Sequence, residues 1–262
     1  MSSPSMGRFF FDTEFTNGNY YLGDIIEIAL LAEESGHMFQ SYVQIHYLIP
    51  TRVKELTNIS DDLLASAGCR FRDAMVAFLD FIQREQIKSS TAPVIIAHGG
   101  YLFDFPILLA NCMKYGVSDY GVLINCSFID SIELFKACGY IKPGLDTLCN
   151  KFGLERYTHS ALSDVQILRT VFTQHSISYK YTMKCVNTVR TYKFEDLLFH
   201  LKQKLPVPIQ TINSWALKCN SKEDLELSLT KFVQKKTALN ANQLLKITHW
   251  YFKDRFVLKN CI

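Results

Sequence analysis

Four acidic residues and one histidine have the types and spacing to carry out chemistry in this sequence. Two acids form an Asp-x-Glu pair near the N-terminus, one follows an apolar run, and one follows the histidine by five positions. The five residues are Asp12, Glu14, Asp104, His159 and Asp164. Carboxylate oxygens are preferred ligands of Mg²⁺ and Mn²⁺. If the fold brings the four carboxylates together with the histidine at the rim, they form a two-metal site for phosphodiester hydrolysis.

The three acids in the first part of the sequence each have an ordinary alternative. Asp12 and Glu14 lie two apart on an expected strand, so they share a face and repel each other unless a cation neutralises them. The alternative is a pair of solvent-facing acids on an edge strand. Asp104 follows a buried strand, at the sheet edge where α/β proteins bind ligands. It is also a residue type favoured at a helix start.

Asp164 and His159 are expected at the start of a later helix. Asp164 lies one turn before Leu168 on the apolar side of that helix, where a carboxylate needs a cation or a donor. His159 is expected on the loop that leads into the helix, where a histidine can act as a general base. The alternative for a loop histidine is a plain surface residue.

The elements that position these residues follow from the hydrophobic pattern. Apolar runs predict strands at 8–12, 24–32, 38–45, 93–97 and 123–130. Helical periodicity predicts helices at 71–82, 106–112, 145–152 and 161–172, with Gly153 ending the third. A strand meander followed by alternating strands and helices predicts an α/β fold, a mixed sheet with helices on both faces.

The charge distribution divides the chain into two parts. Residues 1–179 hold 13 Lys or Arg against 19 Asp or Glu, whereas residues 180–262 hold 15 against 6. We therefore expect a catalytic domain over 1–178 and a basic, mainly helical C-terminal region over 179–262. Helices are predicted there at 193–204, 221–236 and 240–257. The basic region either holds a nucleic acid, binds a protein partner or is a solvated face.

Composition narrows the class of protein. The 48% hydrophobic and 20% charged residues are typical of a globular chain. Eight cysteines without a CxxC pair predict reduced thiols in an intracellular protein, with cytoplasm and nucleus both open. No apolar stretch reaches the roughly 18 residues that a membrane span needs, so no membrane partner is expected.

Taken together, these segments resemble the DEDDh exonucleases of the RNase H-like superfamily. That family includes the DNA polymerase III proofreading subunit and the three-prime repair exonucleases. Asp12-Thr13-Glu14 matches the first family motif, residues 95–106 the second, and 159–164 the third. Connecting segments 56–60 and 148–154 match as well, and the resemblance covers roughly residues 8–178.

The resemblance implies a 3′→5′ exonuclease that releases nucleoside 5′-monophosphates. It implies that the four acids bind two Mg²⁺ or Mn²⁺ ions and that His159 takes a proton from the attacking water. It also implies substrate contacts from Thr13, Phe15, Thr16, Ile59, His98 and Tyr101. The rings of Phe15 and Tyr101 are candidates to stack on the terminal base, the alternative being that they are packed.

The sequence departs from the family pattern at three positions near the expected terminal nucleotide. Phe15, Asn58 and Gly99 stand where the family commonly has Thr, Gly and Asn. These departures bear on substrate preference. Single-stranded or 3′-ended DNA is favoured over RNA because residues 97–108 are most similar to the three-prime repair branch. The alternatives are a nucleic-acid-binding or scaffold protein that retains the fold, and a nuclease of small dinucleotides.

Overall fold

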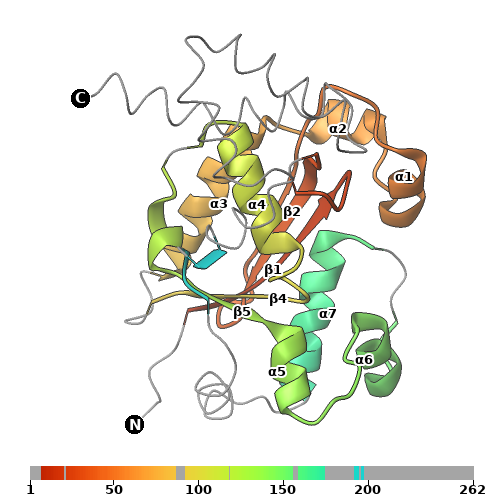
Figure 1. Ribbon diagram of the computed structural model, residues 1–262, viewed down its shortest axis with the longest axis vertical. Helices are drawn as coiled ribbons and strands as arrows, with labels where there is room; N and C mark the ends of the chain where they lie inside the picture. The colour runs from red at the N-terminus through yellow and green to blue at the C-terminus, as the bar shows by residue number, and fades with distance from the viewer. Residues whose placement is uncertain are drawn as a thin grey trace, which may run out of the picture.

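A computed structural model describes residues 7–20, 22–86, 92–117, 119–155, 159–174, 192–194 and 196–197. Its centre is a five-stranded sheet in the order β3-β2-β1-β4-β5 (Figure 1). The strands are β1 Arg8–Phe15, β2 Ile25–Ala32, β3 Met38–Tyr42, β4 Val94–Ala97 and β5 Ser127–Asp130. The first three pair antiparallel, whereas β4 and β5 run parallel to β1. The predicted mixed sheet is confirmed.

Helices cover both faces of the sheet, as predicted (Figure 1). They are α1 Thr51–Thr57, α2 Asp61–Ala67, α3 Phe71–Gln86, α4 Asp104–Lys114, α5 Ser131–Ala137, α6 Leu145–Phe152 and α7 Ala161–Gln174, with a 3₁₀ helix η1 at Gly121–Asn125. Alternate residues of β1 enter different cores. Phe9 and Phe11 pack with α3 and α4, whereas Phe10 packs with α5, α6 and α7. The period-two alternation of a strand therefore determines on which face of the sheet each β1 side chain packs.

Several predicted boundaries differ from the structure. Residues 121–125 form η1, so β5 is confined to Ser127–Asp130. A short apolar run does not by itself distinguish a strand from a helical turn. β1 continues three residues past its predicted end at residue 12, through Phe15, whereas β3 stops at Tyr42. The helix expected from Pro106 begins two residues earlier, at Asp104. Gly153 does end α6, in the left-handed conformation at φ 64°.

A short piece of the C-terminal region packs against the sheet. Tyr192 and Phe128 of β5 exchange two backbone hydrogen bonds of 2.9 Å, and Tyr192, Phe194 and Leu197 are buried in the α3–α4 core. The helices expected at 221–236 and 240–257, and most of that at 193–204, lie outside the described residues. The division at residue 178 stays a prediction.

Two expectations from composition concern the described residues. The five cysteines described there are all free thiols: Cys69, Cys112, Cys126, Cys138 and Cys149. Within the same part of the chain, each helix is too short or too polar to cross a bilayer.

Candidate catalytic and metal-binding site

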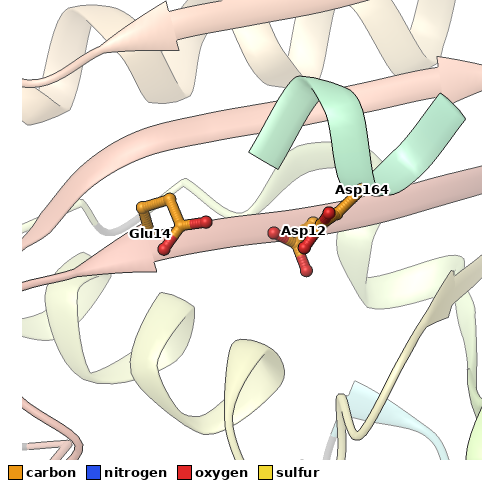
Figure 2. Close-up of side chains that lie close together, drawn as sticks. All are labelled: Asp12, Glu14 and Asp164. Carbon is orange, nitrogen blue, oxygen red and sulfur yellow. The ribbon is translucent and has the colours of Figure 1, made fainter. Parts of the chain in front are cut away.

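Three of the four predicted acids converge on the α7 face of the sheet. One carboxylate oxygen from each of Asp12, Glu14 and Asp164 lies within 4.8 Å of the others. Figure 2 shows the carboxyl groups of Asp12 and Asp164 adjoining, with Glu14 further along the same strand. Oxygen donors at this spacing suit a hard divalent cation. The donor set therefore fits a divalent cation, and the choice of Mg²⁺ or Mn²⁺ stays a prediction.

The pattern of β1 and α7 explains this convergence. Asp12 and Glu14 continue the alternation begun by Phe10, whose ring packs edge-on against Phe172 of α7 with centroids 5.1 Å apart. The first turn of α7 is closed by a 2.9 Å hydrogen bond from Asp164 N to Ser160 O. Packing of α7 on the sheet thus brings its acidic first turn over the acidic end of β1.

Asp104 approaches β1 from the opposite face. It is 4% exposed and begins α4. Its Oδ1 accepts hydrogen bonds from Thr13 N at 3.0 Å and Thr13 Oγ1 at 2.8 Å. It lies outside the three-carboxylate group, yet after burial its charge does most to raise the pKa of Asp12. Asp104 therefore lies next to the three-carboxylate group. It is hydrogen-bonded to Thr13, which lies between Asp12 and Glu14 on β1.

The electrostatics of Asp12 and Asp104 favour a cation at this site. Burial first, and then the charges of Asp104, Glu14 and Asp164, raise the pKa of Asp12 well above its usual value. Burial also raises the pKa of Asp104 to about 7, against the opposing effect of the hydrogen bonds from Thr13. Carboxylates destabilised in this way gain most when a positive charge binds between them.

His159 lies where the sequence predicted it, on the segment that leads into α7. It is partly buried and precedes the first residue of that helix by two positions. It directly precedes Ser160, whose backbone O accepts the 2.9 Å hydrogen bond from Asp164 N. Its role as a base stays a prediction.

Three of the expected substrate-binding residues are part of the framework around the acids. Thr13 holds Asp104. Thr16 Oγ1 contacts Tyr47 Oη at 2.8 Å and accepts a 3.0 Å hydrogen bond from Asp24 N. Ile59 is 3% exposed and packs in a small apolar cluster beside β2. Their side chains have structural partners, and their contacts with substrate stay predictions.

The other three expected binding residues are partly buried. The Tyr101 ring stacks on Tyr192 with centroids 4.1 Å apart and 13° between planes. One face of the Tyr101 ring is therefore packed against the protein, which is the alternative to stacking on a base for that face. His98 Nδ1 lies 2.8 Å from Ser131 Oγ. Phe15 packs against the α3–α4 core, and its role toward substrate also stays a prediction.

Two buried acids that sequence reasoning missed organise this region. Asp130 accepts hydrogen bonds from the N–H groups of Gly99 at 3.0 Å and Tyr101 at 3.2 Å, and it caps α5. Glu27 is fully buried in β2 and accepts from Ala161 N at 3.0 Å. A signal for Glu27 existed, since a charged residue inside the apolar run at 25–32 must find partners when buried.

A mixed sheet of this order, with helices on both faces and a carboxylate group on its central strand, defines an RNase H-like nuclease fold. The exonuclease family model (RNase T type) matches residues 9–172, and the chain belongs to this family. Exonucleases of this family act on nucleic acids and generally use divalent metals.

Two known proteins illustrate the relationship. The chain is 26% identical over 168 residues to a PolC-type DNA polymerase III of Staphylococcus saprophyticus. The matched segment covers 62% of this chain and 11% of that protein. This chain therefore spans about a tenth of that relative. The crystal structure of a full-length 3′-exonuclease superposes with a TM-score of 0.54 at 18% identity, over 67% of this chain and 64% of that one. This second likeness concerns the fold alone.

Proposed function

We propose that this protein is a metal-dependent 3′→5′ exonuclease that releases nucleoside 5′-monophosphates, with DNA preferred over RNA. The observation that carries the proposal is the convergence of Asp12, Glu14 and Asp164 within 4.8 Å. Asp104 is a fourth acid near them, hydrogen-bonded to Thr13 between Asp12 and Glu14. Four acids of this kind in an exonuclease-family chain support catalysis over a scaffold that merely keeps the fold.

The acids would hold the cofactor in two groups. Asp12, Glu14 and Asp164 would bind one divalent cation directly, and Asp104 with Asp12 would contribute to a second. Bound Mg²⁺ or Mn²⁺ would supply a water of lowered pKa and neutralise charge on the phosphodiester oxygens. Thr13 fixes the orientation of Asp104 before any cation arrives, because both of its donors engage the same carboxylate oxygen.

His159 is proposed as the base that takes the proton of the attacking water. It enters from the segment before α7, next to the turn that carries Asp164. A histidine changes charge near neutral pH, which suits proton transfer under physiological conditions. The proton would pass from the water to an imidazole nitrogen as the bond between phosphorus and the leaving 3′ oxygen breaks. That oxygen would stay on the shortened strand and take up a proton from solvent.

The polarity of the reaction is tested with substrates that differ only at their ends. A 5′-labelled linear single strand should shorten stepwise from its 3′ end in Mg²⁺ or Mn²⁺ and remain intact in EDTA. A circular strand of the same sequence should resist, and a 3′-phosphate should slow the reaction. Rapid cutting of circles would identify an endonuclease and overturn the proposal.

The preference for DNA is tested in the same assay. Matched DNA and RNA oligonucleotides and dinucleotides should give the highest kcat/KM for DNA. RNA recognition depends on contacts to the 2′-hydroxyl, so an RNA preference would show as a loss on 2′-deoxy substitution at the terminal residue. Exclusive turnover of dinucleotides would favour the small-substrate alternative, and binding without turnover would favour a scaffold.

We also propose that the basic region over 180–262 contributes to substrate binding through its charge. Its 15 Lys or Arg against 6 Asp or Glu would attract the phosphate backbone. Phosphate contacts release counterions, so each contact adds nearly one unit to the log–log dependence of affinity on salt. Replacing Lys231, Lys235 and Lys236 with Glu in the full chain should raise KM on long strands and flatten this dependence. Unchanged values would favour a protein partner for this region.

A further inference from the structure

Glu27 is a buried carboxylate on the α7 face of the sheet whose hydrogen bonds join three separate parts of the chain. It lies in β2 with 0% exposure. Its Oε1 accepts from Gln40 Nε2 of β3 at 2.7 Å and from Ser160 Oγ at 3.3 Å. Its Oε2 accepts from Ala161 N at 3.0 Å. A carboxylate buried in this way is tolerated only because donors surround it.

One of these donors belongs to the start of α7. The first N–H groups of a helix have no partner within the helix, and Ala161 is the first residue of α7. Glu27 supplies the missing acceptor from a strand 134 positions away in the sequence. Its negative charge also suits the positive end of the helix dipole. Glu27 therefore caps α7 from the sheet.

The capped turn carries Asp164 and follows His159 closely, so two of the five candidate catalytic groups lie at this end of α7. Asp164 N bonds Ser160 O at 2.9 Å, and His159 directly precedes Ser160. On the sheet, Glu27 is the register partner of Glu14, so the two side chains share a face. A single side chain thus connects the strand pair that holds Asp12 and Glu14 to the turn that holds Asp164.

We propose that Glu27 is a positioning residue that sets the placement of Asp164 and His159 relative to Asp12 and Glu14. The proposal deepens the exonuclease function and rests on it. All three partners donate to Glu27 in this structure, and the Ala161 N–H can only donate. Glutamine at this position keeps an oxygen for Ala161 N, but it loses the negative charge at the start of α7. It also turns an NH₂ group toward Gln40 and Ser160, whose side chains must reorient to accept. Aspartate keeps the charge but is one methylene shorter and loses the reach to Ala161.

The test compares E27Q and E27D with a control, E33Q, in the full chain. Glu33 lies just after the same strand and forms an ion pair with Arg8, so E33Q removes a partly buried charge without touching the first turn of α7. Measurements are Mn²⁺ affinity by calorimetry or EPR, kcat and KM on a linear DNA strand, and the thermal midpoint. A merely structural residue would change the midpoint alone.

Both Glu27 variants should weaken Mn²⁺ binding and lower kcat by roughly 10- to 100-fold, as outer-shell partners of metal ligands do. KM should stay within about twofold because the substrate-facing surface is unchanged, and E33Q should match the wild type in Mn²⁺ affinity and kcat. Wild-type Mn²⁺ affinity and kcat in folded E27Q would overturn the proposal. An unaffected E27D with an impaired E27Q would assign Glu27 a charge effect and also overturn positioning.

If the Glu27 variants do not fold, the S160A variant tests the positioning role of Glu27 instead. It removes one donor to Glu27 and leaves the backbone contact of Ala161 in place. Mn²⁺ affinity should fall about threefold to fivefold, in line with the loss of one hydrogen bond, and an unchanged affinity would contradict the proposal. Mn²⁺ affinity is measured without turnover. An inactive wild type that binds Mn²⁺ would therefore count against the exonuclease function, and the role of Glu27 would still be tested.

Discussion

The two sides of the candidate site are supported in different ways. On the α4 side, Asp104 is held by two donors of Thr13, a residue that lies between Asp12 and Glu14 on the same strand. On the α7 side, Asp164 belongs to a helix turn that is held to the neighbouring strand through Glu27. Asp104 therefore moves with β1, whereas the position of Asp164 depends on how α7 seats on β2. We expect the α4 side to be rigid and the α7 side to be the adjustable one.

The largest effect is expected from loss of the ligand that we propose to be common to both sides. Asp12 is that proposed ligand, so D12N should lower kcat/KM by more than ~10⁴-fold, since metal charge stabilisation is worth several kcal/mol. The substitution barely changes side-chain volume, and the thermal midpoint of the metal-free protein should not fall. Single-turnover assays with and without Mg²⁺ measure the loss. Substantial turnover by D12N would contradict the metal assignment.

The α7 side alone is tested by H159A. Loss of a general base should lower kcat on the order of 10²- to 10⁴-fold. Mn²⁺ affinity should be nearly unchanged because His159 is not proposed as a ligand. A rate equal to that of the wild type would show that His159 is a bystander.

The α4 side alone is tested by T13V. The variant keeps the Thr13 N–H donor and loses the 2.8 Å bond from Oγ1 to Asp104. That bond lowers the pKa of Asp104, so its removal should raise this pKa and move the acidic limb of the pH–rate profile to higher pH. The expected fall in kcat/KM is about tenfold, typical of one hydrogen bond to a charged group. T13S should behave as wild type. If the acidic limb of T13V lies at the wild-type pH, the hydrogen bond from Thr13 Oγ1 does not support Asp104.

The smallest effect concerns the stability of the metal-free protein. An unfolded Asp has a pKa of about 3.9, whereas burial raises the pKa of Asp104 to about 7 in the folded protein. Between these values the folded state holds more protons, so the free energy of unfolding should fall as pH rises from about 4 to about 7. Mg²⁺ should then raise the thermal midpoint more at pH 8 than at pH 5. D104N should show a flatter dependence, and equal slopes for the two proteins would exclude Asp104 as the source.

Local patterns predicted the elements that carry strong signals of their own. The apolar run at 93–97 became β4, and Gly153 ended α6 because it adopts a left-handed conformation. The short helices α1, α2 and α5 were missed because seven residues give too little periodicity for a helix to be recognised. The two acids on β1 were singled out by their spacing together with the resemblance of the surrounding segments to a known family.

The supports of the site were not predictable in the same way. Glu27 and Ala161 are 134 positions apart, and Asp104 and Thr13 are 91 apart. Partners at such separations are set by the packing of helices on the sheet, which local pattern does not reveal. The sequence does indicate that a buried acid at position 27 needs donors, but it does not say which ones.

The stacking of Tyr101 on Tyr192 has a practical consequence for work with shorter versions of this chain. Tyr192 pairs with the edge strand β5, and Phe194 and Leu197 fill the α3–α4 core. A fragment that stops at residue 178 would leave that edge and those apolar contacts open to solvent. Exposed strand edges invite pairing with other chains, so such a fragment is expected to aggregate on expression. The shortest soluble catalytic fragment should extend at least through Leu197.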